Sequence, residues 1–157
     1  VARQGGAQTM LDPAPAQRLP AEFLRLADVL TPNETEALIL LGQPPARLQP
    51  AEAPALTQAL RALGAQRVVL KLGDQGCFYD DGARQIHVPA FPVQVRDSTA
   101  AGDIFNAGLA VALAEGRPTE DALRFASAAA AISVTRLGAQ ASVPTRAEVE
   151  AFLQTAG

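Results

Sequence analysis

Several features that point to common protein functions are missing from this sequence. It has one cysteine, Cys77, which excludes an internal disulfide and suits a reducing cytosol. Its formal net charge is −3 and no basic stripe runs along it, so nucleic acid is a poor candidate partner. No apolar run reaches membrane-spanning length, and nothing at the start resembles a signal peptide. These absences favour a cytoplasmic protein that binds neither nucleic acid nor membrane.

Two nucleotide-binding motifs are missing as well. There is no G-x4-G-K-[ST] sequence, which excludes a P-loop enzyme, and Gly5-Gly6 lacks the glycine spacing of a dinucleotide-binding fold. Lysine is nearly absent, because Lys71 is the one lysine beside twelve arginines. A lysine kept against such a bias is a hint that a compact ammonium group is needed at this place.

The patterns that are present predict an α/β fold. A chain of 157 residues with 48% hydrophobic residues is long enough to bury a real core as one domain. Strands are predicted over residues 7–11, 29–30, 67–72 and 93–95, and residues 77–79 and 84–88 form a hairpin. Helices are predicted over residues 20–27, 32–41, 54–63, 104–115 and 119–135, with a last one that ends near 154. We therefore expect a mainly parallel sheet with helices on both faces and one β-hairpin.

Polar and small residues follow the expected strands at their ends. Asp12, Asn33, Gly73 and Asp97 each lie at such an end or one helix cap beyond it. Ligands of α/β sheets bind beyond the carboxyl ends of the strands, so these residues should line one edge.

The helix over 32–41 has two overlapping start signals. We expect Thr31 as its N-cap and Glu34 as the partner in a capping box, which leaves Glu36 free. Asn33 and Glu36 lie one helical turn apart, so they could hold a hydrated Mg²⁺ and reach phosphate groups together. Plain capping explains the same N-x-x-E spacing equally well.

The chain is organised around residues 96–108, which read RDSTAAGDIFNAG. An apolar run ends before them and a long Ala/Leu helix pattern follows, so they form a turn of small residues that leads into a helix. Small side chains let a ligand approach the backbone, and the amides that open a helix attract anions. Asp103 falls in the first helical turn, where it could orient an attacking hydroxyl or take its proton. The bland alternative is that Asp97 caps a turn and Asp103 complements the helix dipole.

This stretch resembles the second signature of the ribokinase-like (PfkB) carbohydrate kinase family at every position, and within it the chain is closest to the ribokinases. The resemblance implies that Asp103 is catalytic and contacts the sugar. It also implies that the amides around Gly102 receive the transferred phosphoryl group. The implied catalytic set is Ala100, Ala101, Gly102 and Asp103.

Further pieces carry the same resemblance. The segment 71–76 looks like the nucleotide turn of the family, and Lys71 could reach ATP phosphates as a point charge; a solvated charge at a strand end is the alternative. Ser127 falls at the adenine side of ATP, and Glu36 holds Mg²⁺ through water. The implied ATP-binding residues are Asn33, Lys71, Leu72, Gly73, Asp74, Gln75, Gly76, Gly102, Asp103 and Ser127.

The loop near the C-terminus resembles the potassium loop of ribokinases. By this resemblance, oxygens of several residues, many of them backbone carbonyls, enclose a monovalent cation that braces the anion turn from beneath. These residues are Asp97, Thr99, Ser133, Arg136, Gly138 and Ser142.

The activity implied is an ATP-dependent sugar kinase. It transfers the γ-phosphate of ATP to the primary hydroxyl of a pentose, in the first place ribose to ribose 5-phosphate, with Mg²⁺ and K⁺ as further cofactors. The resemblance covers only the C-terminal half of the family, so residues 1–157 are expected to be a single nucleotide-binding and catalytic domain. By the same resemblance, the sugar site and lid are expected to belong to an N-terminal half that these residues do not include.

Two alternatives stay open. The first is another member of the family: a fructokinase, a 2-keto-3-deoxygluconate kinase or a nucleoside kinase. The second, of another class, is a non-catalytic nucleotide-binding fragment or assembly module. The partners expected are ATP and a small sugar, and the full-length protein is compatible with a homodimer.

Overall fold

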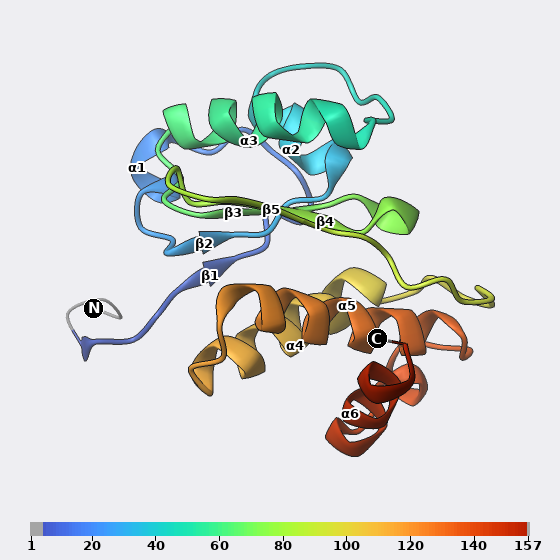
Figure 1. The fold of residues 1–157 in the computed structure, drawn as a ribbon. Helices are drawn as coiled ribbons and strands as arrows, with labels where there is room; N and C mark the ends of the chain where they lie inside the picture. The colour runs from blue at the N-terminus through green and yellow to red at the C-terminus, as the bar shows by residue number, and fades with distance from the viewer. Residues whose placement is uncertain (1–4, 157) are drawn as a thin grey trace. The chain divides into compact units, whose positions relative to one another are not determined.

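The structure is a computed structural model that describes residues 5–156 (Figure 1). Its residues group into two compact units, which divide between His87 and Val88 and are described separately. The strands are β1 (Met10–Leu11), β2 (Val29–Leu30), β3 (Val68–Lys71), β4 (Cys77–Asp80) and β5 (Gln85–Val88). The helices of the first unit are α1 (Ala21–Leu24), α2 (Glu34–Leu40) and α3 (Ala53–Ala62), with 3₁₀ turns η2 (Pro50–Glu52) and η3 (Gly73–Gln75). The single domain expected from the chain length stays a prediction.

The first unit is built on a mixed five-stranded sheet in the order β1-β2-β3-β4-β5. β1 pairs with β2 and β2 with β3 in parallel, while β3 and β4 are antiparallel. The expected parallel sheet and the expected hairpin are thus both present, as neighbouring parts of one sheet. Because β1, β2 and β3 are parallel, their carboxyl ends meet at one edge.

A leucine-rich core joins the sheet to its helices. Figure 1 shows α2 and α3 over one face of the sheet. Leu30, Leu60 and Leu70 are fully buried between these layers. β3 reads Val-Val-Leu-Lys, and its first three side chains are buried, as the continuous apolar pattern predicts for a central parallel strand. The charge of Lys71 therefore appears only where this strand reaches the edge.

The first helix and the first strand are shorter than predicted. β1 keeps only two residues of the expected 7–11. α1 has four residues of the expected 20–27, and Phe23 is 58% exposed while Leu24 and Ala27 are buried. One helical turn gives too few residues for an amphipathic pattern to define a face.

The second unit contains α4 (Ala101–Ala114), α5 (Thr119–Val134), η4 (Gln140–Ser142) and α6 (Arg146–Thr155). The strand predicted over 93–95 is wrong, because residues 89–95 have irregular backbone. The chain is held there by the end of α5 instead, since the amides of Arg96 and Asp97 both donate to the Val134 carbonyl. α5 matches the helix expected over 119–135, and Pro118 is its N-cap residue.

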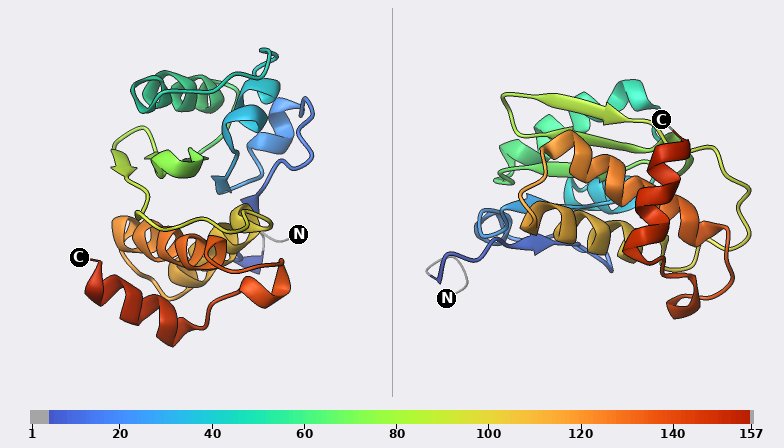
Figure 2. Two further views of the ribbon diagram at one scale, coloured as in Figure 1. Left: turned by 90° about the vertical axis from the view of Figure 1, so that its right-hand side faces the viewer. Right: turned by 60° about the horizontal axis from the view of Figure 1, so that its bottom comes forward.

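Small residues bring α4 and α5 close together, and Figures 1 and 2 show the two helices side by side. A β-carbon placed on Gly108 would lie 3.1 Å from the Ala126 α-carbon and 3.4 Å from the Ala129 β-carbon. The alanine run 126–131 therefore lets α5 approach α4 closely at Gly108.

Candidate active site

Three polar residues meet at the carboxyl edge of the parallel strands in the first unit. Asp12 follows β1, Asn33 follows β2, and Lys71 ends β3. The Lys71 ammonium lies 3.1 Å from a carboxylate oxygen of Asp12, and Asn33 forms a parallel bridge with Lys71. The prediction that Asp12 and Asn33 share an edge is confirmed. The interpretation of Lys71 as a solvated charge is wrong, because its side chain is 12% exposed and ion-paired.

Asn33, and not Thr31, caps α2. Its Oδ1 accepts from the Glu36 amide at 2.9 Å, and its own amide donates to Glu36 Oε2 at 2.7 Å. The expectation that Glu34 closes the capping box and leaves Glu36 free is therefore wrong. Glu36 is buried in the box, while Glu34 accepts from the Leu48 amide at 2.9 Å.

The Asn33–Glu36 pair can still take part in a magnesium site. The capping bonds use one oxygen of each side chain, which leaves Asn33 Nδ2 and Glu36 Oε1 outside the pair. Within residues 5–156, no three His, Cys, Asp or Glu side chains converge as a metal cage. Glu36 Oε1 is the possible oxygen ligand, directly or through water, and Asn33 Nδ2 can donate a hydrogen bond to phosphate or to a metal-bound water. A single carboxylate suits Mg²⁺, which commonly takes one or two of them and completes its shell with water and substrate phosphates.

The segment after β3 forms a tight turn. Gly73 and Gly76 have φ values of 58° and 92°, a left-handed region that suits glycine. The Leu72 backbone amide donates to the Gly76 carbonyl at 2.8 Å, which closes the turn. The side-chain amide of Gln75 donates to the Leu48 carbonyl at 3.2 Å. The backbone is thus open on its outer side, since nothing lies within 4 Å of a β-carbon placed on Gly73.

Two further contacts hold this turn from outside. His87 Nε2 lies 2.9 Å from the Gln75 carbonyl, and Arg47 Nη2 donates to both carboxylate oxygens of Asp74, at 3.3 and 3.2 Å. Because the Arg47–Asp74 pair is highly exposed, it contributes little stability. The loop that contains Arg47 is nevertheless tied to the turn at two points, through Asp74 and through Leu48.

In the second unit, α4 begins without a side-chain cap. Its N-cap residue is Ala100, in the left-handed conformation at φ 60°, with only a methyl group to offer. Amides without an intrahelical partner at the start of a 14-residue helix can attract an anion, and the helix dipole favours negative charge there. Asp103 lies in the first turn and is exposed. The predicted turn of small residues beside a carboxylate is present, and anion binding by it stays a prediction.

Asp97 ties this turn to the loop near the C-terminus. One carboxylate oxygen accepts from the Thr99 amide and the other from the Gly138 amide, both at 2.9 Å. Hydrogen bonds from the Thr99 side chain and from these two amides lower the pKa of Asp97 to about 2, so it is ionised at neutral pH. Asp97 is therefore more than a local turn cap, because it joins segments 41 residues apart.

The residues of the expected cation loop are only partly oriented toward one another. Asp97, Thr99 and Gly138 are hydrogen-bonded together, whereas the hydroxyls of Ser133 and Ser142 donate to the carbonyls of Ala130 and Ala139. The Arg136 side chain pairs with Glu148. The donor set is still all oxygen, which fits a monovalent cation held mainly by carbonyl groups.

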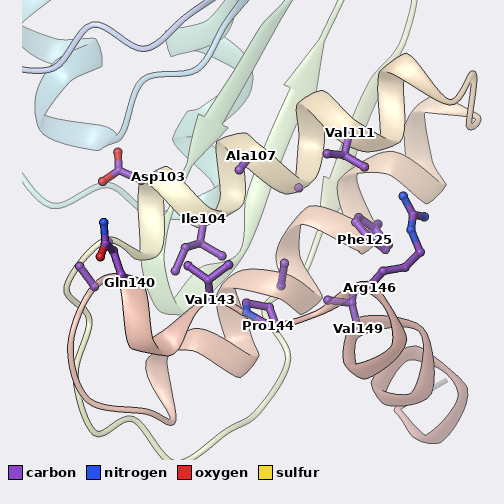
Figure 3. A pocket seen from close by; sticks show the side chains of 14 residues that line it. Asp103, Ile104, Ala107, Val111, Phe125, Gln140, Val143, Pro144, Arg146 and Val149 are labelled. Atoms are coloured by element: carbon purple, nitrogen blue, oxygen red, sulfur yellow. The ribbon is translucent and has the colours of Figure 1, made fainter.

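An apolar hollow of about 540 Å³ lies beside the opening of α4. Figure 3 shows Asp103 and Gln140 at one end and Phe125 and Arg146 at the other. Ser127, predicted near adenine, is buried in α5 and does not line this hollow. Gln140 was missed by the sequence analysis because glutamine in a loop carries no motif.

Two contacts that shape the first unit's part of the site were also missed. The sequence analysis placed Asp12 at the edge without its bond to Lys71, and it gave Glu34 a capping role instead of its contact with the 43–50 loop. The lone lysine was the available signal for the first contact. Nothing local to Glu34 indicates the second contact, which joins residues 14 positions apart.

Among the helices of residues 5–156, none has the length and apolar character that a membrane span requires.

The sequence and the structure were compared with known proteins, and the matches are to carbohydrate kinases. The family model "pfkB family carbohydrate kinase" matches residues 1–146. The ribokinase of Haemophilus influenzae is 45% identical over 156 residues, which are 99% of this chain and 50% of that protein. The structure of Arabidopsis thaliana ribokinase with ribose and ATP has a TM-score of 0.89 at 36% identity, over 96% of this chain and 49% of that one. A candidate ribokinase II of Escherichia coli with ATP and Mg²⁺ has a TM-score of 0.77 at 29% identity, over 98% and 50%. The chain thus spans about half the length of the relatives it matches.

Proposed function

Because the chain belongs to the pfkB family of carbohydrate kinases, we propose that it is the ATP-binding and catalytic half of a sugar kinase. The reaction proposed is transfer of the ATP γ-phosphate to the primary hydroxyl of a pentose, with ribose as the first candidate. The single observation that carries this proposal is the opening of α4, where uncapped amides lie beside the exposed carboxylate of Asp103.

The amides at the start of α4 serve the transferred phosphoryl group. Phosphoryl transfer passes through a loose transition state, so positioning and electrostatic stabilisation supply most of the rate enhancement. The segment 100–102 carries no bulky side chain over its backbone; the Ala101 amide donates to the Ser98 carbonyl at 3.2 Å, so the Gly102 amide is the one proposed to face the phosphoryl group. Asp103 orients the sugar hydroxyl and finally takes its proton, for which a weak base is sufficient.

The first unit contributes further nucleotide contacts in this proposal. Lys71 and Asn33 bind ATP phosphates, and Glu36 holds Mg²⁺ through water. Bound Mg²⁺ neutralises charge on the phosphates. The turn of residues 72–76 lies along the nucleotide. Ser127, which belongs to α5 of the second unit, is proposed to contact the adenine side on the family resemblance alone. The matched kinase structures with ATP and with ATP and Mg²⁺ support ATP and Mg²⁺ as the ligands in this proposal.

A monovalent cation, with K⁺ as the candidate, completes the proposal. Carbonyl and carboxylate oxygens of the six loop residues named above would hold it, and a bound cation supplies positive charge near the anion turn. Asp97 supports this assignment because its ionised carboxylate already joins the turn to the loop. A cytoplasmic location and a homodimer of the full-length protein are proposed on the family assignment alone.

The substrate is the finer part of the proposal. The H. influenzae relative is a ribokinase and the A. thaliana structure holds ribose, so ribose is placed before fructose, 2-keto-3-deoxygluconate and nucleosides. The ranking is tested by comparing kcat/KM for these acceptors, with the chain and with the protein translated from the whole reading frame that contains it.

The catalytic role is tested by Asp103→Asn. We expect kcat to fall about 10²- to 10⁴-fold with the affinity for a non-hydrolysable MgATP analogue preserved, because general-base contributions have this size. Asp121→Asn is the matched control, since Asp121 lies in the first turn of α5 and should tolerate the change. Turnover near the wild-type level in Asp103→Asn would refute the assignment. Nucleotide binding without turnover of any sugar would favour a non-catalytic binding module.

A further inference from the structure

The ion pair between Asp12 and Lys71 crosses the end of a strand. β2 lies between β1 and β3 in the sheet, and neighbouring strands are about 4.8 Å apart. Asp12 follows β1 and Lys71 ends β3, so their side chains meet above the chain that leaves β2. That chain is pinned on both sides, because the Thr31 amide donates to the Leu11 carbonyl and the Lys71 amide to the Pro32 carbonyl. The backbone beneath the Asp12–Lys71 ion pair is therefore held in place by hydrogen bonds to both neighbouring strands.

Burial decides what this pair can contribute. The side chains of Lys71 and Asp12 are 12% and 27% exposed, so both charges have lost much of their hydration. Such pairs roughly break even against apolar side chains in their effect on folding stability. The ion pair therefore adds little to folding stability, but it fixes the Lys71 ammonium group at a defined position.

We propose that Asp12 is a positioning residue that holds the Lys71 ammonium in place for the nucleotide phosphates. This inference rests on the proposed function. An ammonium group has three N–H donors, and the bond to Asp12 Oδ2 occupies one of them. The others can bind a phosphate oxygen while Asp12 keeps the group still. Lysine is a long and flexible side chain, so ordering it in advance reduces the loss of freedom when the nucleotide binds.

If Asp12 instead competed with the nucleotide for Lys71, its removal would change the nucleotide affinity in the opposite direction. If its carboxylate competed with phosphate for Lys71, removing the carboxylate charge would strengthen nucleotide binding. If it positions Lys71, the same change weakens binding. Asp12→Asn separates the two roles because it keeps the shape of the side chain and one acceptor oxygen.

The experiment combines calorimetry with one NMR signal. Because Lys71 is the only lysine, the chain labelled with ¹³Cε-lysine gives a single lysine signal that reports on this site. A non-hydrolysable MgATP analogue and adenosine are titrated into the wild type, Asp12→Asn, Lys71→Met and the double variant. Glu22→Gln, which removes one charge from an exposed position of α1, is the matched control.

We expect the analogue to shift the lysine signal and adenosine to leave it unchanged. Asp12→Asn should weaken analogue binding about two- to tenfold, the cost of ordering one long side chain, with adenosine affinity unchanged. In the Lys71→Met background, Asp12→Asn should cause no further loss. Glu22→Gln should bind like the wild type.

Equal or tighter analogue binding in Asp12→Asn, or an equal loss for adenosine, would overturn the inference. So would analogue binding that leaves the lysine signal unmoved, and in each of these cases the proposed function survives. Its own failure looks different: no binding of either ligand and no sugar turnover by the wild type.

Discussion

The contact between α4 and α5 makes a quantitative prediction at Gly108. A β-carbon there would lie 3.1 Å from the Ala126 α-carbon, where ordinary carbon contacts are about 3.5–4.0 Å. The nearest atom belongs to the backbone, so no side chain can rotate away. Gly108→Val adds this carbon and two more, and the helices must separate to accommodate them.

Two effects of opposite sign set the magnitude. Valine is a better helix former than glycine by about 0.4 kcal/mol. Overpacking of a tight interface costs about 1–3 kcal/mol, and the upper part of this range applies because three carbons enter. We expect Gly108→Val to lower the free energy of unfolding by about 2 kcal/mol. Gly108→Ala should lie close to zero, because about 1 kcal/mol of helix propensity offsets a smaller clash.

Urea unfolding followed by circular dichroism measures the effect. With a slope of about 2 kcal/mol per molar urea, the midpoint of Gly108→Val should fall by about 1 M at unchanged slope. Ala110→Val is the matched control on the exposed side of the same helix, and it should cost only about 0.6 kcal/mol from propensity. If Gly108→Val is no more destabilising than this control, or if Gly108→Ala stabilises by the full propensity gain, the close approach is refuted.

Three further predictions follow from single side chains. Since the pKa of Asp97 lies near 2 in the folded chain against an ordinary 3.8, its ionised form stabilises the fold above pH 4; the stability gap between wild type and Asp97→Asn, from urea unfolding at each pH, should narrow as pH falls from 4 to 2. Ala100→Gly should leave the melting temperature unchanged or raise it, because relief of the left-handed strain offsets the entropy that glycine adds to the unfolded chain. Ala110→Gly, the control inside α4, should lower the free energy of unfolding by about 1 kcal/mol. Asp80→Ala should cost about 3 kcal/mol by thermal unfolding, because Arg61 loses its ion pair with a buried carboxylate, and the Gly82 amide and the Gln85 side-chain amide lose their acceptor.

The start of α2 shows where local sequence reasoning reached its limit. Thr31-x-x-Glu34 and Asn33-x-x-Glu36 are both valid capping boxes, and the chain uses the second. The reason lies in the sheet: the Thr31 amide bonds to Leu11 and the Pro32 carbonyl to Lys71, so both residues stay extended beside the strands. The helix can begin only after Pro32.

The sequence by itself determined the α/β alternation, the tight turn after Lys71 and the anion turn that opens α4. These depend on contacts within a few residues: proline and glycine positions, small side chains and the apolar period of strands and helices. Residues 93–95 were the local failure, because an apolar run forms a strand only when another strand is available to pair with it.

Tertiary structure alone decided which charged groups meet. Asp12 and Lys71 are 59 residues apart in the chain, and Asp97 reaches an amide 41 residues away. Such pairs form because parallel strands end at a common edge and because the end of α5 holds the 96–97 backbone. A one-dimensional pattern carries no information about which loop faces which, so the partners of these side chains came from the fold.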